Sequence, residues 1–272
     1  MTGADTAARS LAHWSEAGRA EMNAFYVVAR RDYRLLAEVA DWRALLDGRR
    51  TLLDVACGSG KLPEALLRYA ELPAGPLRYD LLDPSAFSLA VAARALAPPF
   101  APGARFETTL QALDPVAGPW EVVWAVHALY ALAPADLEHG IGRLVDAVSP
   151  GGIGLLAHAT AESHYLRVYR HFLADFRAGA GTPYSSAEDL EAALTRAGTR
   201  PRRLHRLTYD GELAAGEERT LEGYLQRCVF DATVSLEAML DAPTLGPYLR
   251  ALRGHDGTWR FPQTVDLVAI EK

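Results

Sequence analysis

The 272-residue chain contains little of what marks several common protein classes. Its two cysteines, Cys57 and Cys228, are too few for a disulfide framework or a cysteine-rich metal site. Its net charge of −6 argues against a nucleic-acid groove, which needs a basic face. No apolar run is long enough to span a membrane, and the first ten residues lack the apolar segment of a signal peptide. These absences predict a cytoplasmic protein that contacts neither membrane nor nucleic acid.

The stretch from Leu52 to Lys61 joins an apolar run to a turn that contains Gly58 and Gly60. Asp83 follows 23 residues after Gly60, at the end of a second apolar run. This order is typical of a nucleoside site at the carboxyl end of a parallel sheet, because glycine lets the backbone turn sharply beside a ligand. An acid at the end of the second strand can accept hydrogen bonds from ribose hydroxyls. Asp80, three residues earlier, is a rival for that role.

Details of this loop exclude two phosphate-binding motifs. A dinucleotide site needs a third small residue where the chain has Pro63, and no Gly-Lys-Ser/Thr sequence of a P-loop follows. Asp54 lies inside the first apolar run, where a carboxylate is costly unless paired, and the amino group of a methionine moiety would be a fitting partner. The motif resembles the first motif of class I S-adenosyl-L-methionine-dependent methyltransferases, with Ala56 where that family often has its first glycine. The resemblance implies S-adenosyl-L-methionine as the cofactor.

Apolar periodicity predicts an α/β fold with helices between most of the strands. The last strand is expected to lie antiparallel beside the sixth, and a helical pattern runs from Leu11 to Leu46. Together with the resemblance, this predicts a Rossmann-like seven-stranded class I methyltransferase fold. It divides into a helical cover (1–50), a cofactor-binding core (51–210 and 259–272) and a helical insertion that serves as a substrate lid (211–258). The seven strands are expected over 51–56, 77–82, 105–108, 121–126, 153–158, 203–209 and 264–270.

The second half of the chain resembles small-molecule methyltransferases of the histamine N-methyltransferase type. Four segments carry this resemblance in order: Val126–Tyr130, Tyr184–Leu190, Tyr224–Thr233 and Phe261–Thr264. It implies methylation of a nitrogen, or an indole-type carbon, of an aromatic or amine-bearing small molecule in specialised metabolism. Two alternatives stay open, a cyclase of the same fold that binds the cofactor without transferring methyl, and a small-molecule O-methyltransferase. No cluster of acids suggests a metal, and the sequence leaves the oligomeric state open.

By resemblance, the cofactor contacts come from the first motif, the end of the second strand and the segments after the third and fourth strands. These residues are Asp54, Ala56, Cys57, Gly58, Ser59, Gly60, Asp83, Pro84, Ser85, Leu110, Gln111 and Val126.

His127 is the candidate catalytic residue, because it directly follows the fourth strand, near the expected position of the transferred methyl group. An unperturbed imidazole is suited to removing a proton near neutral pH. The histamine-methylating enzymes have a glutamine at the matching position, so His127 is either a base or a group that only orients the substrate. His158, at the end of the fifth strand, is a weaker candidate and is more simply structural.

A set of aromatic and polar residues is expected to bind the acceptor. Tyr165 and Tyr169 share one helix face, and a cage of tyrosines favours a flat or cationic substrate. The alternative is that these rings belong to an ordinary amphipathic core. Asp32 matches the amine-binding acid of the resembled family, and Gln263 matches an amide that meets the substrate. The expected set is Asp32, Tyr130, Tyr165, Tyr169, Tyr184 and Gln263.

Overall fold

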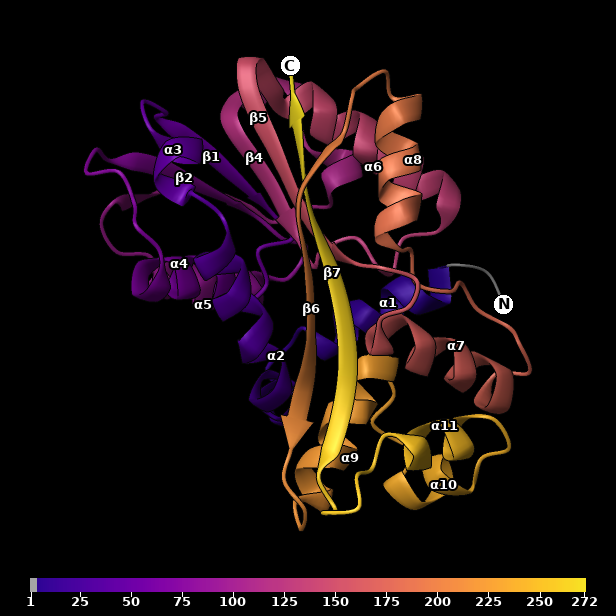
Figure 1. Ribbon diagram of the computed structural model, residues 1–272. Coiled ribbons are helices and arrows are strands. Elements are labelled where there is room, and N and C mark those ends of the chain that lie inside the picture. Colours follow the sequence, from indigo (N-terminus) through magenta and orange to yellow (C-terminus); the bar gives the residue numbers. More distant parts are fainter. Residues whose placement is uncertain (1–3) are drawn as a thin grey trace.

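A computed structural model describes residues 4–272 and contains one seven-stranded sheet with helices on both faces (Figure 1). The strand order is β3-β2-β1-β4-β5-β7-β6, and β7 runs antiparallel to both of its neighbours. The expected α/β fold and antiparallel last strand are therefore confirmed. The strands are β1 (Thr51–Val55), β2 (Leu77–Leu82), β3 (Phe100–Phe106), β4 (Trp120–Val126), β5 (Val148–Ala159), β6 (Arg202–Leu213) and β7 (Trp259–Glu271).

Side chains of the central strands alternate between two cores, as the period of a strand requires. In β1, Leu53 and Val55 pack toward helices α6 (Pro134–Ala147) and α8 (Ala187–Arg196). Leu52 packs on the opposite face. That face is covered by α3 (Trp42–Leu46), α4 (Lys61–Tyr69) and α5 (Ala86–Ala95). Both faces of the central strands β1 and β4 are thus buried, between the helix layers that Figure 1 shows.

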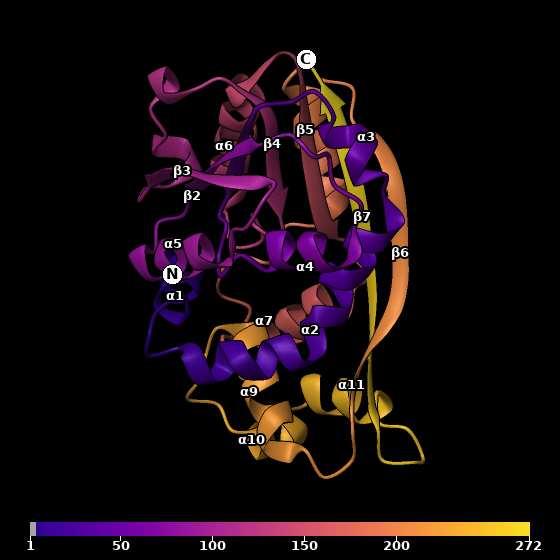
Figure 2. The same cartoon turned by 90° about the vertical axis from the view of Figure 1, so that its left-hand side faces the viewer.

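The remaining helices gather beyond the carboxyl ends of the parallel strands (Figures 1 and 2). The strands β6 and β7 are long and extend beyond the others, so the helices between them pack at this end of the sheet. The apolar residues of all the helices at this end form a separate core that includes Tyr169, Phe172, Tyr224 and Leu249. These helices are α1 (Ala4–His13), α2 (Arg19–Val39), α7 (His164–Phe176), α9 (Glu218–Val229), α10 (Leu236–Asp241) and α11 (Leu245–Ala251).

The helical pattern expected from Leu11 to Leu46 is confirmed, and two turns divide this region into α1, α2 and α3. At the first turn, a Cβ on Gly18 would lie 2.2 Å from the carbonyl oxygen of His13, so only glycine allows this close approach. At the second, Asp41 accepts a hydrogen bond from the Ala44 amide and caps α3. Local chemistry at these two turns therefore divides the helical pattern.

The third strand was expected over residues 105–108, but β3 already begins at Phe100, which pairs with Leu77 of β2. This earlier start places Pro102 inside the strand. However, β3 is an edge strand, and a proline there does not interrupt a ladder on the solvent side. The position of the strand at the edge of the sheet, which the local sequence does not show, explains the difference.

Candidate active site

The loop after β1 has the backbone geometry of a tight ligand-binding turn. Ala56, Gly58 and Gly60 all have a positive φ, of 51°, 51° and 72°. A Cβ on Gly60 would lie 3.0 Å from the Cα of Ala92 in α5, so this position has no room for a side chain. Helix α4 begins directly after Gly60. The loop therefore turns sharply at the carboxyl edge of the sheet and leaves its backbone accessible from that side.

Asp83, at the carboxyl end of β2, is bound to this loop. Its carboxylate accepts hydrogen bonds from the Gly58 amide (3.0 Å) and from the Ser85 amide (2.8 Å). Burial nevertheless raises the pKa of Asp83 to about 6. Its rival Asp80 instead accepts hydrogen bonds from the Trp120 indole (2.7 Å) and the Ala104 amide (2.8 Å). The carboxylate of Asp80 therefore joins β2 to neighbouring segments. The carboxylate of Asp83, in contrast, faces the open cleft described next.

A cleft with about 1050 Å³ of open space lies at this edge of the sheet. Residues from the β1 loop, the end of β2 and the segment after β3 line it. Among them are Ala56, Gly58, Asp83, Pro84, Thr109, Leu110 and Gln111. A smaller adjoining space is lined by Asp54, Cys57 and Val126. Asp54 accepts a hydrogen bond from the Tyr79 hydroxyl (2.6 Å), and burial raises its pKa to about 7.

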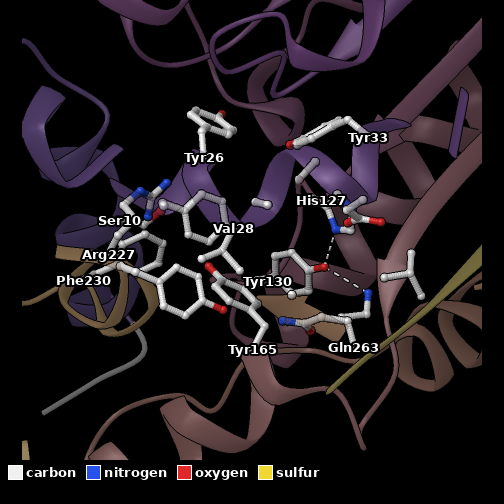
Figure 3. Close-up of a pocket in the computed structure, with 18 of the residues that line it drawn as sticks. Ser10, Tyr26, Val28, Tyr33, His127, Tyr130, Tyr165, Arg227, Phe230 and Gln263 are labelled. Carbon is white, nitrogen blue, oxygen red and sulfur yellow. Dashed lines mark hydrogen bonds and ion pairs between the residues drawn. The ribbon is translucent and has the colours of Figure 1, made fainter. Parts of the chain in front are cut away.

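A second cavity, with about 840 Å³ of open space, lies between the sheet edge and helices α2 and α9 (Figure 3). Its walls are mainly aromatic, with a few polar groups among the rings. Trp14, His127 and Ala128 line both this cavity and the cleft, so the two spaces meet at these residues. The aromatic lining residues are Trp14, Phe25, Tyr26, Tyr33, Tyr130, Tyr165, Tyr209, Tyr224 and Phe230.

Three polar side chains lie in a row where the spaces meet, joined by one hydrogen bond and one close contact. The Ala159 amide donates to the Tyr130 hydroxyl (2.9 Å), so the proton of that hydroxyl is available for His127 Nδ1, at 2.6 Å. When the imidazole is neutral, its proton then resides on Nε2, which lies in close contact with a carboxylate oxygen of Asp32 without making a hydrogen bond to it. Asp32 is buried on α2, with 6 % of its surface exposed. We refer to Asp32, His127 and Tyr130 as the relay.

The sequence matches the profile of a methyltransferase domain over residues 27–203, which is well over half of the chain. The chain belongs to this methyltransferase family. The cofactor of the family is S-adenosyl-L-methionine, as the sequence predicted. No curated protein sequence matches the chain.

Solved structures show the same fold at low sequence identity. Magnesium protoporphyrin IX methyltransferase from Synechocystis PCC 6803 is 13% identical, with a TM-score of 0.56 over 96% of this chain and 97% of that one. The YcgJ protein from Bacillus subtilis is 14% identical, with a TM-score of 0.54 over 89% and 98%. The [4+2]-cyclase SpnF is 20% identical, with a TM-score of 0.50 over 89% and 80%. The Rossmann-like seven-stranded class I methyltransferase fold is therefore confirmed.

Most of the expected cofactor residues of this methyltransferase line the cleft or the adjoining space, but three do not. The hydroxyl of Ser59 donates to Tyr26 (3.0 Å), and Gly60 is the turn residue packed against α5. Ser85 caps α5 and donates to the carbonyl oxygen of Trp14 (2.6 Å). These three residues support the walls of the site instead of lining it, because their polar or backbone groups are engaged within the protein.

Among the expected acceptor residues, Asp32, Tyr130, Tyr165 and Gln263 line the aromatic cavity. The expectation that Tyr169 and Tyr184 also form its wall is corrected by the structure. Their rings stack on each other with centroids 3.7 Å apart, in a layer behind Tyr165. The hydroxyl of Tyr184 donates to the Cys228 carbonyl oxygen (2.8 Å). Both side chains therefore belong to the core that supports the cavity.

The two histidines singled out from the sequence have different surroundings. His158 stacks on Tyr130 with a centroid distance of 3.8 Å and contacts the Ser185 carbonyl oxygen through Nε2 (3.0 Å). Burial lowers the pKa of His158 to about 3, so this side chain is neutral near pH 7. It is not among the residues that line the cavity. His127 lines both spaces and has a φ of 54°, in the left-handed region. Its two ring nitrogens are both engaged in the relay.

From α2 the sequence interpretation named only Asp32, and from α9 it named no cavity residue, although it expected the insertion to cover the substrate. Phe25, Ala29, Asp32 and Tyr33 all line it, and their spacing of three, four and seven residues places them on one face of α2. That spacing was visible in the sequence, although it does not show what the face meets. From α9, Tyr224 and Arg227 line the cavity. No group of three or more metal-ligating side chains, and no helix able to cross a membrane, occurs within residues 4–272.

Proposed function

We propose that this methyltransferase transfers a methyl group to a nitrogen, or an indole-type carbon, of an aromatic or amine-bearing small molecule, in the manner of the histamine N-methyltransferase type. The observation that carries this proposal is the relay. A buried carboxylate and an imidazole line an aromatic cavity that shares part of its wall with the cofactor cleft. Aromatic faces attract a flat or cationic acceptor, and Asp32 complements a nitrogen that carries protons. The proposal includes a role of the enzyme in specialised metabolism.

The cleft suits S-adenosyl-L-methionine. Its glycine turn has no room for a side chain at Gly60, and the ribose-binding acid Asp83 faces the open space. We propose that Asp54, Cys57 and Val126 contact the methionine portion of the cofactor, while Leu110 and Gln111 flank its adenine. Bound there, the cofactor supplies an electrophilic methyl group on a sulfonium. The protein mainly has to align the acceptor with that methyl group and remove a proton from the acceptor.

The relay offers a route for that proton. The Tyr130 oxygen accepts one hydrogen bond from the Ala159 amide. Its second lone pair can accept another from the N–H group of the molecule that is methylated. As Tyr130 receives the acceptor's proton, its own proton passes to His127 Nδ1, so the hydroxyl stays neutral. Asp32 then stabilises the imidazolium through its contact with Nε2. This arrangement follows the same logic as a hydroxyl–histidine–carboxylate triad, in which the acid orients and stabilises the histidine.

We further propose that the cofactor-binding core comprises residues 51–210 and 259–272, with the cover (1–50) and the insertion (211–258) enclosing the acceptor. The cavity residues support this division. Phe25 and Asp32 come from the cover, whereas Tyr224 and Phe230 come from the insertion. The contacts between α2 and α9 join the cover to the insertion over the cavity (Figure 2).

Methyl transfer can be tested with S-adenosyl-L-methionine labelled on its methyl group and a panel of aromatic amines, indoles and phenols. We expect labelled product and an equal amount of S-adenosylhomocysteine, with the label on nitrogen or an indole carbon by mass spectrometry. A label on oxygen would favour the O-methyltransferase alternative. Conversion of an acceptor without label or S-adenosylhomocysteine would favour the cyclase alternative. Asp83→Ala serves as the control, because loss of hydrogen bonds to a charged group should weaken cofactor binding by about 1.5–3 kcal/mol.

A further inference from the structure

Arg227 of α9 is a buried cation without a polar partner in the part of the chain that the structure describes. Its side chain lines the acceptor cavity, and only 3% of the residue is exposed. Nε and Nη1 form no hydrogen bond, and no carboxylate within residues 4–272 forms an ion pair with the guanidinium. Instead, its central carbon lies 4.3 Å from the ring centroid of Trp14 and 4.5 Å from that of Phe230.

Of the acids on neighbouring segments, Asp231 and Asp32 are engaged elsewhere, whereas Glu21 of α2 has a buried carboxylate oxygen without a hydrogen bond and forms no ion pair with Arg227. Asp231, one turn further along the chain, binds Arg177 (2.5 Å) and accepts hydrogen bonds from Thr233. Asp32, which also lines the cavity, contacts His127 in the relay. Figure 3 shows Arg227 with Ser10 and Phe230 on one side of the cavity, and His127 with Gln263 on the other. The cavity thus has a cationic end and, away from it, the acid and base groups of the relay.

An unpaired buried cation is costly, since it loses its hydration without gaining a counter-ion. The two aromatic faces offset only part of that cost through cation–π attraction. Nε and Nη1 are buried, so a carboxylate would reach the guanidinium through Nη2, which also forms no hydrogen bond within residues 4–272. A cation held in this state at the wall of a ligand cavity is preorganised for an anion that arrives with the ligand.

We propose that Arg227 binds a carboxylate of the acceptor. The acceptor would then be an aromatic compound with the nitrogen to be methylated near the relay and a carboxylate at the opposite end, as in an amino acid whose side chain is a nitrogen heterocycle. This inference rests on the proposed function and adds a substrate class to it. The methionine carboxylate of the cofactor has the same chemistry. However, Arg227 lines the acceptor cavity and is absent from the walls of both cofactor spaces.

Calorimetric titration of the protein saturated with S-adenosylhomocysteine tests the proposal without relying on turnover. The probes are three pairs of an amino acid and its decarboxylated amine: L-tryptophan and tryptamine, L-histidine and histamine, and L-tyrosine and tyramine. For at least one pair, we expect the wild-type protein to bind the acid about tenfold or more tightly than the amine. The variant Arg227→Gln should lose this preference. Arg219→Gln is the matched control, because Arg219 is exposed on the same helix.

Titration of S-adenosylhomocysteine into the same variants without a probe separates the two sources of a carboxylate. We expect its affinity for Arg227→Gln to stay within about twofold of wild type. A loss of tenfold or more would assign the guanidinium to the cofactor and overturn the proposal. If no acid of the three pairs binds the wild type more tightly than its amine, the proposal is also wrong. Failure of methyl transfer with preserved acid preference would instead contradict only the proposed function.

Discussion

The relay predicts that His127, Tyr130 and Asp32 act as one unit in proton removal. In His127→Gln, the amide can still bridge Asp32 and Tyr130, but it cannot take up a proton. We therefore expect kcat to fall by about 10²–10⁴-fold, the usual contribution of general base catalysis. At about 1.36 kcal/mol for each factor of ten, this corresponds to about 3–5 kcal/mol of transition-state free energy. Acceptor KM should change little, because the glutamine keeps the hydrogen-bonding shape of the site.

Tyr130→Phe tests the hydroxyl separately. The ring can keep its stacking on His158, but the Ala159 amide and His127 Nδ1 each lose their partner. Leaving a buried donor unsatisfied costs about 1–3 kcal/mol, so thermal unfolding should report this loss of stability. Turnover should fall as in His127→Gln. Because groups that act as a unit are not additive, the double variant should be no slower than the slower single variant.

The assay is release of S-adenosylhomocysteine under saturating cofactor, with the free energies of activation compared in a double-mutant cycle. Two results would refute the reasoning. Turnover of His127→Gln within about threefold of wild type would show that the histidine only orients the acceptor. Fully additive losses in the double variant would show that Tyr130 and His127 contribute independently, so that no proton passes between them.

Two further predictions concern the cofactor loop. Burial raises the pKa of Asp83 to about 6 and that of Asp54 to about 7, and the proposed cofactor contacts of both residues require the carboxylate form. The affinity for S-adenosylhomocysteine, measured by calorimetry, should therefore be constant above about pH 8 and fall as the pH drops through 7 and 6. The variant Asp83→Asn should lose the lower of these two steps. A wild-type affinity that does not change with pH would contradict this prediction. Gly60→Ala places a Cβ 3.0 Å from Ala92 at a positive φ and should lower the free energy of unfolding by about 1–3 kcal/mol. The matched change Gly142→Ala, in a helix with open space around it, should be neutral or stabilising by up to about 1 kcal/mol in the same melts.

The cofactor loop could be predicted from sequence because its chemistry is local. Gly58 and Gly60 occupy left-handed backbone positions within a few residues of the strand that they follow, and Asp83 ends the next strand. Such positions leave a direct signal in the residue types. Even the rivalry between Asp80 and Asp83 needed the structure, because only the packing of Trp120 against β2 shows that Asp80 is already bound.

The acceptor cavity was less predictable because distant segments build it. Asp32 and His127 were both candidates, but their contact depends on how α2 crosses the end of the sheet. Tyr165 and Tyr184 have the same residue type, yet one lines the cavity and the other supports it from behind. Arg227 lies in a segment that carried the family resemblance, but nothing in the sequence marked it as a residue of the cavity. Its significance comes from the missing counter-ion, which is a property of the surrounding fold.

Ser85 shows how residues outside both spaces can still determine the site. Its amide binds the carboxylate of Asp83, and its hydroxyl binds the carbonyl oxygen of Trp14. The Trp14 ring lies under the Arg227 guanidinium and lines both the cleft and the cavity. A short series of contacts thus runs from Asp83, the proposed ribose-binding acid, to the cation at the far end of the acceptor cavity. The expectation that Ser85 touches the cofactor stays a prediction, although the residue does not line the cleft and instead holds the wall that the two ligand spaces share.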